Sequence, residues 1–468
     1  MYKTIIGLEI HTELNTTSKI FSSAKNTYSL DANTNVEPVD IALPGTMPFF
    51  NKEVLKKSIL LAKIFNMEIA DYIMFDRKHY FYCDLPKGYQ ITQFFKPIGQ
   101  KGTYKMLNGK TIRIHDIHIE EDTASLDHFD NYTLIDYNRC GIPLIEIVTE
   151  PDFEGVDEAI SFLEDLRLIL KNANLSEADV TKGNIRCDVN ISVKKDSDEE
   201  LGTRVEIKNV NSFSNVRKVI ESESKRQIEC LEKGIIINQE TRRYDEESKT
   251  TKLMRSKEDA IDYRYFVEPN IPIFDLSDEF VSSIKNDFIL PNDLLDKYTN
   301  EYNISLVNAK KIIKSSEMIN YFTECINLSL NPVKVTNVLT GVISEYLNKK
   351  EISISKYFLK PNDLKILFEK LDNEEISSKQ MKEIILNINE EQIDVDSYIK
   401  KHNIKLISDE EEITKIIMEV LEENKDKLES YKNGNTNLEK FFSGQIMKKT
   451  NGNINPQKAN KKLKELLI

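Results

Sequence analysis

An alternation of polar and apolar positions predicts the first element of the chain. Between Ile6 and Leu14, Leu8 and Ile10 alternate with Glu9, His11 and Glu13. Successive side chains of a strand point to opposite faces, so one face of this strand can pack on a core. The other face then presents an imidazole between two carboxylates. A solvated edge strand would show the same pattern, so this segment alone does not identify a site.

Similar periodicities predict a mixed α+β region up to about residue 290. Amphipathic helices are predicted over 49–67, after Pro151-Asp152, and over 215–231. Strands are predicted over 100–121 around the Asn108-Gly109 turn, within 133–148, and over 185–193 and 203–210. The last two should form a hairpin across an acidic loop. Hairpins among alternating strands and helices favour an α+β domain over a doubly wound parallel sheet.

Beyond residue 290 the chain is predicted to be helical. Turn-forming sequences at 268–272 and 290–292 interrupt the earlier pattern. Short helices are then predicted over 294–302, 305–315, 317–327, 332–347 and 378–388, and a last helical unit from about 405. We therefore divide the chain into 1–292, 293–402 and 403–468.

The composition adds a charge asymmetry to this picture. The 468 residues are 40% hydrophobic and carry a net charge of −13, as in a globular protein with no general field for nucleic acid. The end of the chain differs, because residues 445–468 contain one acidic residue and six lysines. These are Lys448, Lys449, Lys458, Lys461, Lys462 and Lys464. This segment is either a solvated face or a contact for phosphate groups.

The distribution of cysteines and the hydropathy of the chain indicate the cellular compartment in which we expect the protein. The five cysteines are scattered and contain no Cys-x-x-Cys pair, which argues against a disulfide framework and a cysteine zinc site. We expect no secretory leader and no membrane span, because the chain opens on a strand and no apolar run is long enough. A cytoplasmic protein is the simplest interpretation.

Glu146 is the most informative charged position. It stands alone in the apolar run LIEIV at 144–148. A carboxylate in a buried strand is costly unless it is paired, protonated or bound to a metal. A structural salt bridge, for example to Arg139 or Arg186, is one explanation, and a metal site is the other.

Convergence of several acidic strands would make a magnesium site. The residues concerned are Glu9, His11, Glu121, Glu146 and Asp188. Oxygen ligands dominate this set, and hard cations such as magnesium prefer oxygen. In the segment HDIHIEED, His118 and Glu120 share one side, and Glu121 extends the other. The sequence contains no Walker motif and no G-x-G-x-x-G. The residues alone therefore predict a magnesium-dependent acidic cleft and name no substrate.

Long motifs give the chain a family resemblance. They are GLEIHTEL at 7–14, LPGTMP at 43–48, FDRKHYFYCDLPKGYQIT at 75–92, DYNRCGIPLIEIVTEPD at 136–152, GNIRCDVNIS at 183–192, VEIKNVNSF at 205–213, QETRRYDE at 239–246 and RSKEDAIDYRYFVEPNIP at 255–272. They resemble the B subunit of the aspartyl/glutamyl-tRNA amidotransferases. The segment 441–467 resembles that family's C-terminal tRNA-binding unit, so the similarity covers essentially the whole chain.

The resemblance implies a fold and a reaction. The fold would be a cradle-shaped α+β catalytic domain, a helical domain and a small helical tail. ATP would phosphorylate the side-chain carboxylate of glutamate or aspartate mischarged on tRNA(Gln) or tRNA(Asn). Ammonia would then displace phosphate to give the amide. A glutaminase partner, the family's A subunit, would supply the ammonia from glutamine, and a small C subunit would complete a heterotrimer.

The resemblance also implies site residues. The magnesium ligands map onto Glu9, His11, Glu121 and Glu146, with Asp188 and Asn190 nearby. The cations expected around ATP or the acyl phosphate are Lys78, Lys87, Arg186 and Lys208, each of which could instead be an ion-pair partner. The tRNA would contact Lys448, Lys449, Lys458, Lys461 and Lys462.

The sequence departs from the family pattern at two places, and two alternative functions stay open. Many family members bind a structural zinc through four cysteines, whose positions here hold Ser22, Ala24, Glu37 and Asp40. We therefore expect no zinc. Cys83 replaces a more usual proline and should only adjust a turn. The alternatives are a non-catalytic tRNA-binding scaffold and a stand-alone ligase that uses free ammonia.

Overall fold

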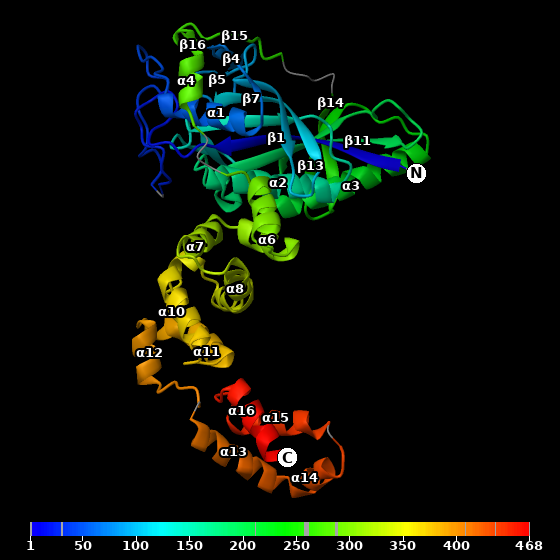
Figure 1. Ribbon diagram of the computed structural model, residues 1–468. Coiled ribbons are helices and arrows are strands. Elements are labelled where there is room, and N and C mark those ends of the chain that lie inside the picture. The colour runs from blue at the N-terminus through cyan, green and yellow to red at the C-terminus, as the bar shows by residue number, and fades with distance from the viewer. Residues whose placement is uncertain are drawn as a thin grey trace. The chain divides into compact units, whose positions relative to one another are not determined.

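The computed structural model describes residues 2–29, 31–210, 212–256, 262–285, 289–407, 409–435 and 437–467 (Figure 1). Residues 257–261, which belong to the motif at 255–272, lie outside the described residues. The chain forms two compact units, Met1–Leu294 and Leu295–Ile468. Among the described residues, no helix has both the length and the apolar character needed to cross a bilayer.

A nine-stranded mixed sheet forms the centre of the first unit. Its strand order is β14-β13-β12-β11-β1-β10-β7-β6-β2. The bounds are β1 Tyr2–Glu13, β2 Glu68–Ile69, β6 Gly99–Lys105, β7 Thr111–Glu121, β10 Pro143–Thr149, β11 Ile185–Lys195, β12 Val205–Val210, β13 Glu240–Asp245 and β14 Thr250–Ser256. Neighbouring strands are antiparallel except β12 and β13. The predicted α+β class is confirmed.

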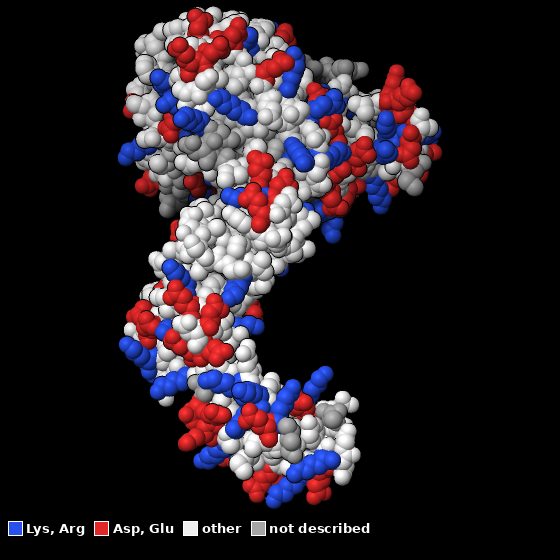
Figure 2. Space-filling view, viewed as in Figure 1, with Lys and Arg blue, Asp and Glu red and all other residues white. Residues whose placement is uncertain are grey.

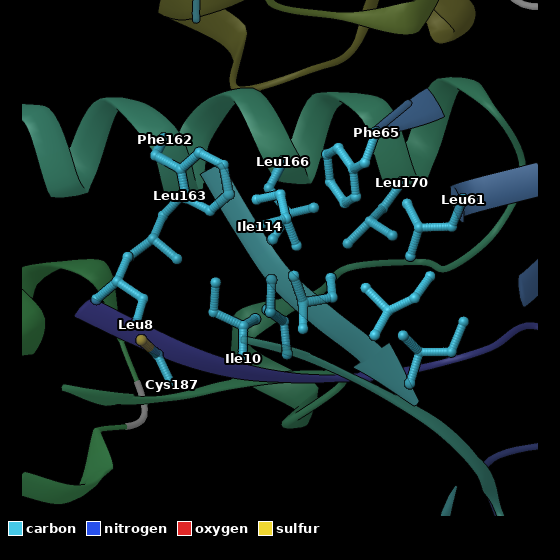
Figure 3. Packing of buried hydrophobic residues seen from close by; sticks show 14 of the residues in the cluster. Leu8, Ile10, Leu61, Phe65, Ile114, Phe162, Leu163, Leu166, Leu170 and Cys187 are labelled. Carbon is cyan, nitrogen blue, oxygen red and sulfur yellow. The ribbon is translucent and has the colours of Figure 1, made fainter. Parts of the chain in front are cut away.

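The predicted strand alternation decides which face of the sheet packs on the core. Helices α1 (Lys52–Ile64), α2 (Val156–Asn172) and α3 (Phe213–Glu232) contribute to the same hydrophobic core as the sheet. Figure 3 shows Phe162 and Leu166 of α2 above Ile114, with Leu8 and Ile10 of β1 nearby. The charged residues of β1 therefore point away from this core, because their neighbours in sequence point into it.

The predicted hairpin at 185–210 is confirmed, since β11 and β12 pair antiparallel. The sheet then continues through β13 and β14, which the periodicity of the chain does not predict. Strand β13 runs parallel to β12, and parallel neighbours need a long crossover, which α3 supplies. Ser212 caps α3 by accepting a hydrogen bond from the Asn215 backbone amide.

Smaller elements surround the sheet. Strands β4 (Asp76–His79), β5 (Tyr89–Thr92) and β15 (Phe266–Val267) make a three-stranded sheet, in which β4 is central. Strands β3 (Tyr72–Ile73) and β16 (Phe274–Asp275) form one pair, and β8 (Ser125–His128) and β9 (Thr133–Asp136) form another. Helix α4 spans Asp278–Ser283, and the turn η1 spans Val180–Lys182.

The rest of the chain is helical, as predicted. Its helices are α5 Pro291–Asp296, α6 Leu306–Ile313, α7 Ser316–Asn327, α8 Pro332–Val338, α9 Ser344–Lys350, α10 Pro361–Asp372, α11 Ser378–Glu391, α12 Val395–Lys401, α13 Glu410–Glu423, α14 Lys425–Lys432, α15 Leu438–Lys449 and α16 Pro456–Leu467. The single helix expected over 332–347 is interrupted, because Gly341 has non-helical backbone angles. Helices α13, α15 and α16 share a core of their own around Ile417, Phe442 and Leu463.

Candidate functional site

Four neighbouring strands align a row of polar residues on the face of the sheet opposite the core. In the strand register, His11 of β1 lies beside Arg186 of β11 on one side and Glu146 of β10 on the other. Glu146 in turn lies beside His118 of β7. Residues aligned across a sheet point to the same face, so the pairing brings together side chains that are far apart in sequence.

A compact acidic cluster occupies the centre of this row. His11 Nδ1 lies 3.1 Å from Glu120 Oε1, and His11 Nε2 lies 3.8 Å from Glu9 Oε1. Glu146 Oε2 lies 2.9 Å from His118 Nε2 and 3.8 Å from His11 Nδ1. We call Glu9, His11, His118, Glu120 and Glu146 the acidic cluster. Three of its ligand atoms, from Glu9, His11 and Glu146, lie within 4.8 Å of one another, as do those from His118, Glu120 and Glu146.

A second group of charges adjoins the acidic cluster through Glu9. Asp188 of β11 lies beside Glu9 in the register, and Glu206 of β12 completes a set whose oxygens lie within 4.8 Å. Lys208 neutralises part of this group, since its Nζ lies 3.0 Å from Asp188 Oδ2 and 2.8 Å from Glu206 Oε1. The predicted proximity of Asp188 to Glu9 is therefore found, and Lys208 lies beside Asp188.

Glu121 does not join the acidic cluster, which is a correction to the expected convergence. It extends the core face of β7, and its carboxylate lies 2.6 Å from Lys87 Nζ. The Ile91 backbone amide donates to its other oxygen at 2.9 Å. Glu120, one residue earlier, points to the opposite face and lies beside His11. Strand parity allows only one of two consecutive residues to reach the cluster.

Glu146 forms ion pairs with histidines, and neither Arg139 nor Arg186, the partners named as examples, contacts it. Arg139 and Arg186 both bind Asp122 instead, Arg139 through two nitrogens at 2.6 and 2.7 Å and Arg186 at 3.0 Å. Glu146 is 8% exposed and contacts only imidazoles among the ion pairs of the described residues. Its burial is therefore not explained by a guanidinium partner.

Interactions within the acidic cluster strongly shift the pKa values of its own residues. Burial favours the neutral imidazole of His11, but the charge of Glu146 and hydrogen bonds with Glu120 and Glu9 raise its pKa to about 10. Similarly, burial opposes ionisation of Glu9, but its hydrogen bond with His11 and the charge of Lys208 lower its pKa to about 2. The interaction between His11 and Glu9 contributes to both shifts. Further carboxylates add to it for His11, and the ammonium of Lys208 adds to it for Glu9.

The donor set of the acidic cluster fits a hard divalent cation. It offers three carboxylates and two imidazoles, with Asp188 and Glu206 adjacent. The same excess of negative charge that favours imidazolium would also attract a metal ion. Carboxylate-rich sets suit magnesium or manganese better than zinc.

The predicted phosphate-binding cations lie in different surroundings. The charges of Glu120 and Glu146 act on Lys78 and, against the effect of burial, raise its pKa, so Lys78 faces the acidic cluster. Lys208 also belongs to this region. Lys87 is instead paired with Glu121, and Arg186 with Asp122. Asn190 lies on the polar face of β11, beside Gly7 in the register.

Hydrogen bonds hold the loop whose positions carry cysteines in the resembling family. Asp40 Oδ2 accepts from Lys19 Nζ at 3.3 Å, from Ser22 Oγ at 3.1 Å and from the Glu37 backbone amide at 2.9 Å. Lys19 is fully buried. Asp40 therefore connects the segments on either side of Ala24.

The C-terminal lysines are partly engaged by nearby glutamates. Lys449 lies 2.9 Å from Glu419 and 2.8 Å from Glu423, and Lys462 lies 3.4 Å from Glu410. Figure 2 shows both signs of charge side by side over the C-terminal helices. Lys448, Lys458 and Lys461 are exposed. The basic segment is therefore a mixed surface.

Sequence reasoning grouped His118 with Glu120 but did not select them as ligands, and it missed Glu206. A signal for the first two was present, since His118 and Glu120 alternate with Ile117 and Ile119 in β7. Glu206 alternates in the same way with Val205 and Ile207 in β12, whose side chains are buried. The strand period alone would have placed all three on the polar face.

Comparisons with known proteins identify the family of the chain. Residues 4–282 match the GatB/GatE catalytic domain, and residues 320–467 match the GatB domain. The chain is 42% identical to the aspartyl/glutamyl-tRNA(Asn/Gln) amidotransferase B subunit of Mycoplasma mycoides, over 98% of this chain and 97% of that protein. It is 41% identical to the proteins of that name from Bacillus licheniformis, over 99% and 98% of the two chains, and Rickettsia canadensis, over 99% and 97%. The expected resemblance is confirmed: this chain belongs to the family of aspartyl/glutamyl-tRNA(Asn/Gln) amidotransferase B subunits.

Proposed function

We propose that this chain is the subunit that amidates mischarged Glu-tRNA(Gln), Asp-tRNA(Asn) or both, and that the acidic cluster is its reaction centre. The observation that carries the proposal is the meeting of His11, Glu120 and Glu146 from three strands, in a chain of this family. A non-catalytic scaffold would have no use for three clustered ionisable groups that contact mainly one another.

The reaction has two steps. The side-chain carboxylate of the mischarged amino acid attacks the γ-phosphorus of ATP, which gives an acyl phosphate and ADP. Ammonia then attacks the acyl carbon, phosphate leaves, and the amide forms after loss of a proton. Activation is needed because a carboxylate has no adequate leaving group.

The residues of this chain position the reactants. Lys78 and Lys208 place two ammonium groups beside the acidic cluster, where they can bind phosphate oxygens. Glu9, His11, Glu120 and Glu146 would hold magnesium. When bound, the ion would neutralise charge on the transferred phosphoryl group. Arg139 and Arg186, bound to Asp122, fix one border of the centre.

The proposal extends to partners and domains. We infer that a glutaminase partner, the A subunit of this family, provides ammonia and that a small C subunit completes a cytoplasmic heterotrimer. The residues 293–402 and 403–468 would act as a helical domain and a tRNA-binding tail, in which the exposed Lys448, Lys458 and Lys461 contact phosphates. The Asp40 hydrogen bonds would take the place of a structural zinc.

A reconstituted complex tests the proposal. We expect Glu146→Gln to preserve folding and assembly but to abolish ATP-dependent amidation of mischarged tRNA. We also expect it to weaken Mn²⁺ binding, followed by the paramagnetic resonance of the free ion, because one carboxylate ligand is lost. Amidation by this variant at the wild-type rate would refute the assignment. A wild-type complex that binds mischarged tRNA but never forms amide would favour the scaffold.

A further inference from the structure

A group of aromatic rings borders the acidic cluster. Phe94 and Tyr265 stack face to face, with ring centroids 4.0 Å apart and an interplanar angle of 8°. Tyr263 packs edge-on against Tyr265, with centroids 6.0 Å apart. We call Phe94, Tyr263 and Tyr265 the aromatic platform. The magnesium and phosphate chemistry proposed above gives these rings no task.

Lys78 connects the aromatic platform to the acidic cluster. Its Nζ lies 5.0 Å from the centroid of the Tyr263 ring. Burial alone would lower the pKa of Lys78, but the charges of Glu120 and Glu146 raise it, and Tyr263 and Tyr265 act on the same ammonium. The backbone places the platform there as well. Gln93, which precedes Phe94, accepts a hydrogen bond at 3.0 Å from the backbone amide of Ile119, which precedes Glu120.

The platform is rigid although it is open to solvent. Phe94 is 55% exposed, and its neighbour Phe95 is 53% exposed. Their backbone amides donate to the same oxygen of the fully buried Asp76, at 2.7 and 2.8 Å. Exposed phenylalanines held in this way cost solvation free energy, which indicates a surface that is covered in a complex.

The backbone of the segment Tyr263–Tyr265 is held in an uncommon conformation. Arg264 has a positive φ of 47°, which is unfavourable for a side chain other than glycine. Two bonds from His79 hold the turn: its amide donates to the Tyr263 carbonyl at 2.8 Å, and its Nδ1 lies 3.1 Å from the Arg264 carbonyl oxygen. Arg264, which follows Tyr263 and precedes Tyr265 in the sequence, is exposed.

We propose that the aromatic platform stacks the 3′-terminal adenosine of the tRNA, the nucleoside to which the reacting amino acid is esterified. This inference rests on the proposed function. If the acidic cluster activates the side-chain carboxylate, the nucleoside at the other end of that short amino acid must lie close by. Unpaired bases are bound by stacking on aromatic side chains, and nearby cations bind the backbone phosphates. Arg264 and Lys78 provide such cations.

The adenine of ATP is the other source of the same chemistry. Sites for small molecules bury most of the ligand surface, whereas Phe94 is more than half exposed to solvent. An open platform with an exposed arginine fits the end of a polymer better than a small nucleotide. The experiment must therefore distinguish binding of the terminal adenosine of tRNA from binding of the adenine of ATP.

Binding of tRNA with and without its terminal adenosine tests the platform directly. In the assembled complex, we expect wild type to lose about tenfold or more in affinity for deacylated tRNA when that adenosine is removed. Phe94→Ala should bind both tRNAs equally, and Phe94→Tyr should restore the difference. Phe49→Ala is the matched control, because Phe49 is 82% exposed and precedes α1.

Kinetics provide the second readout. Phe94→Ala and Tyr265→Ala should raise KM for mischarged tRNA about tenfold or more and leave KM for ATP unchanged, and Tyr265→Phe should behave as wild type. A rise confined to KM for ATP would overturn the inference, as would a terminal-adenosine effect that persists in Phe94→Ala. An inactive wild-type complex would instead refute the proposed function, and the binding comparison could still be made.

Discussion

Two charge clusters adjoin on the polar face of the sheet, and they differ in balance. Around Asp122, one carboxylate lies between the guanidiniums of Arg139 and Arg186, so its negative charge has two permanent partners. Around His11, three carboxylates share two imidazoles that can lose their protons. A balanced cluster holds elements together. An unbalanced one would favour an exchangeable cation. On the proposed function, this difference would separate a structural role from a chemical role within one row of residues.

The largest loss of activity is expected when one of two consecutive residues of β7, which point to opposite faces of the sheet, is substituted. Glu120→Gln removes a carboxylate from the unbalanced cluster, and we expect amidation to fall by about a hundredfold or more. Glu121→Gln breaks a balanced pair with Lys87 instead. It should keep most of its kcat while losing about 3 kcal/mol of stability, because Lys87 is left buried without its partner.

Measurements of kcat at saturating ATP and mischarged tRNA, together with urea unfolding of each variant, would distinguish the two residues. If Glu121→Gln lost as much kcat as Glu120→Gln while remaining folded, the separation of the two faces would not explain the chemistry. The expectation drawn from family resemblance, with Glu121 as the ligand, would then regain support.

This pair also shows what could be predicted from the sequence. The period of two in β7 groups His118 with Glu120 and sets Glu121 apart, so local physics was sufficient to choose between them. The fold class, β1, α2 and the hairpin of β11 and β12 also followed from periodicity. These are long segments in which the burial pattern is regular.

Other features were beyond such reasoning for physical reasons. Strands β13 and β14 carry many polar side chains and lie at one edge of the sheet, where burial imposes little alternation. The binding of Arg139 to Asp122 joins a bend to the end of β7. It depends on tertiary packing, and its two residues carry no periodic signal.

Breaking the balanced cluster should destabilise the fold. Asp122→Asn removes the carboxylate that the guanidiniums of Arg139 and Arg186 share, and Asp122 itself is 3% exposed. We expect a loss of about 3 kcal/mol in the free energy of unfolding, measured by urea denaturation. Asp130→Asn, on the exposed turn between β8 and β9, should change stability by less than about 0.5 kcal/mol. Equal effects in both variants would contradict the structural role of Asp122.

The unbalanced cluster should make the free energy of unfolding depend on pH. Its carboxylates hold the pKa of His11 near 10, above the ordinary 6.5, although burial acts in the opposite direction. Imidazolium formation therefore stabilises the fold fully below pH 6.5, and this contribution is lost as pH rises through 10. The difference in unfolding free energy between wild type and His11→Gln should shrink across that interval.

The affinity for a cation should increase with pH, because the ion competes with the proton of the imidazole. We expect affinity for Mn²⁺ to rise between about pH 6.5 and 9 in wild type, with proton release detectable by calorimetry in buffers of different ionisation enthalpy. In His11→Gln the released proton should disappear. A wild-type affinity independent of pH would show that His11 does not lie among the ligands.

The smallest effect on stability is expected from zinc chelation. The reason is again that a carboxylate, here Asp40, is matched by partners from the protein itself. Asp40 is matched by the ammonium of Lys19 and by two further donors, so the loop at 19–40 needs no divalent ion to offset its charge. A zinc-selective chelator, added with magnesium in excess, should therefore change the unfolding free energy by less than about 0.5 kcal/mol. Asp40→Ala should cost several times more, because it leaves the fully buried Lys19 unpaired. A fall in Tm on chelation that zinc reverses and magnesium does not would mean that this loop depends on a cation that its own side chains cannot replace.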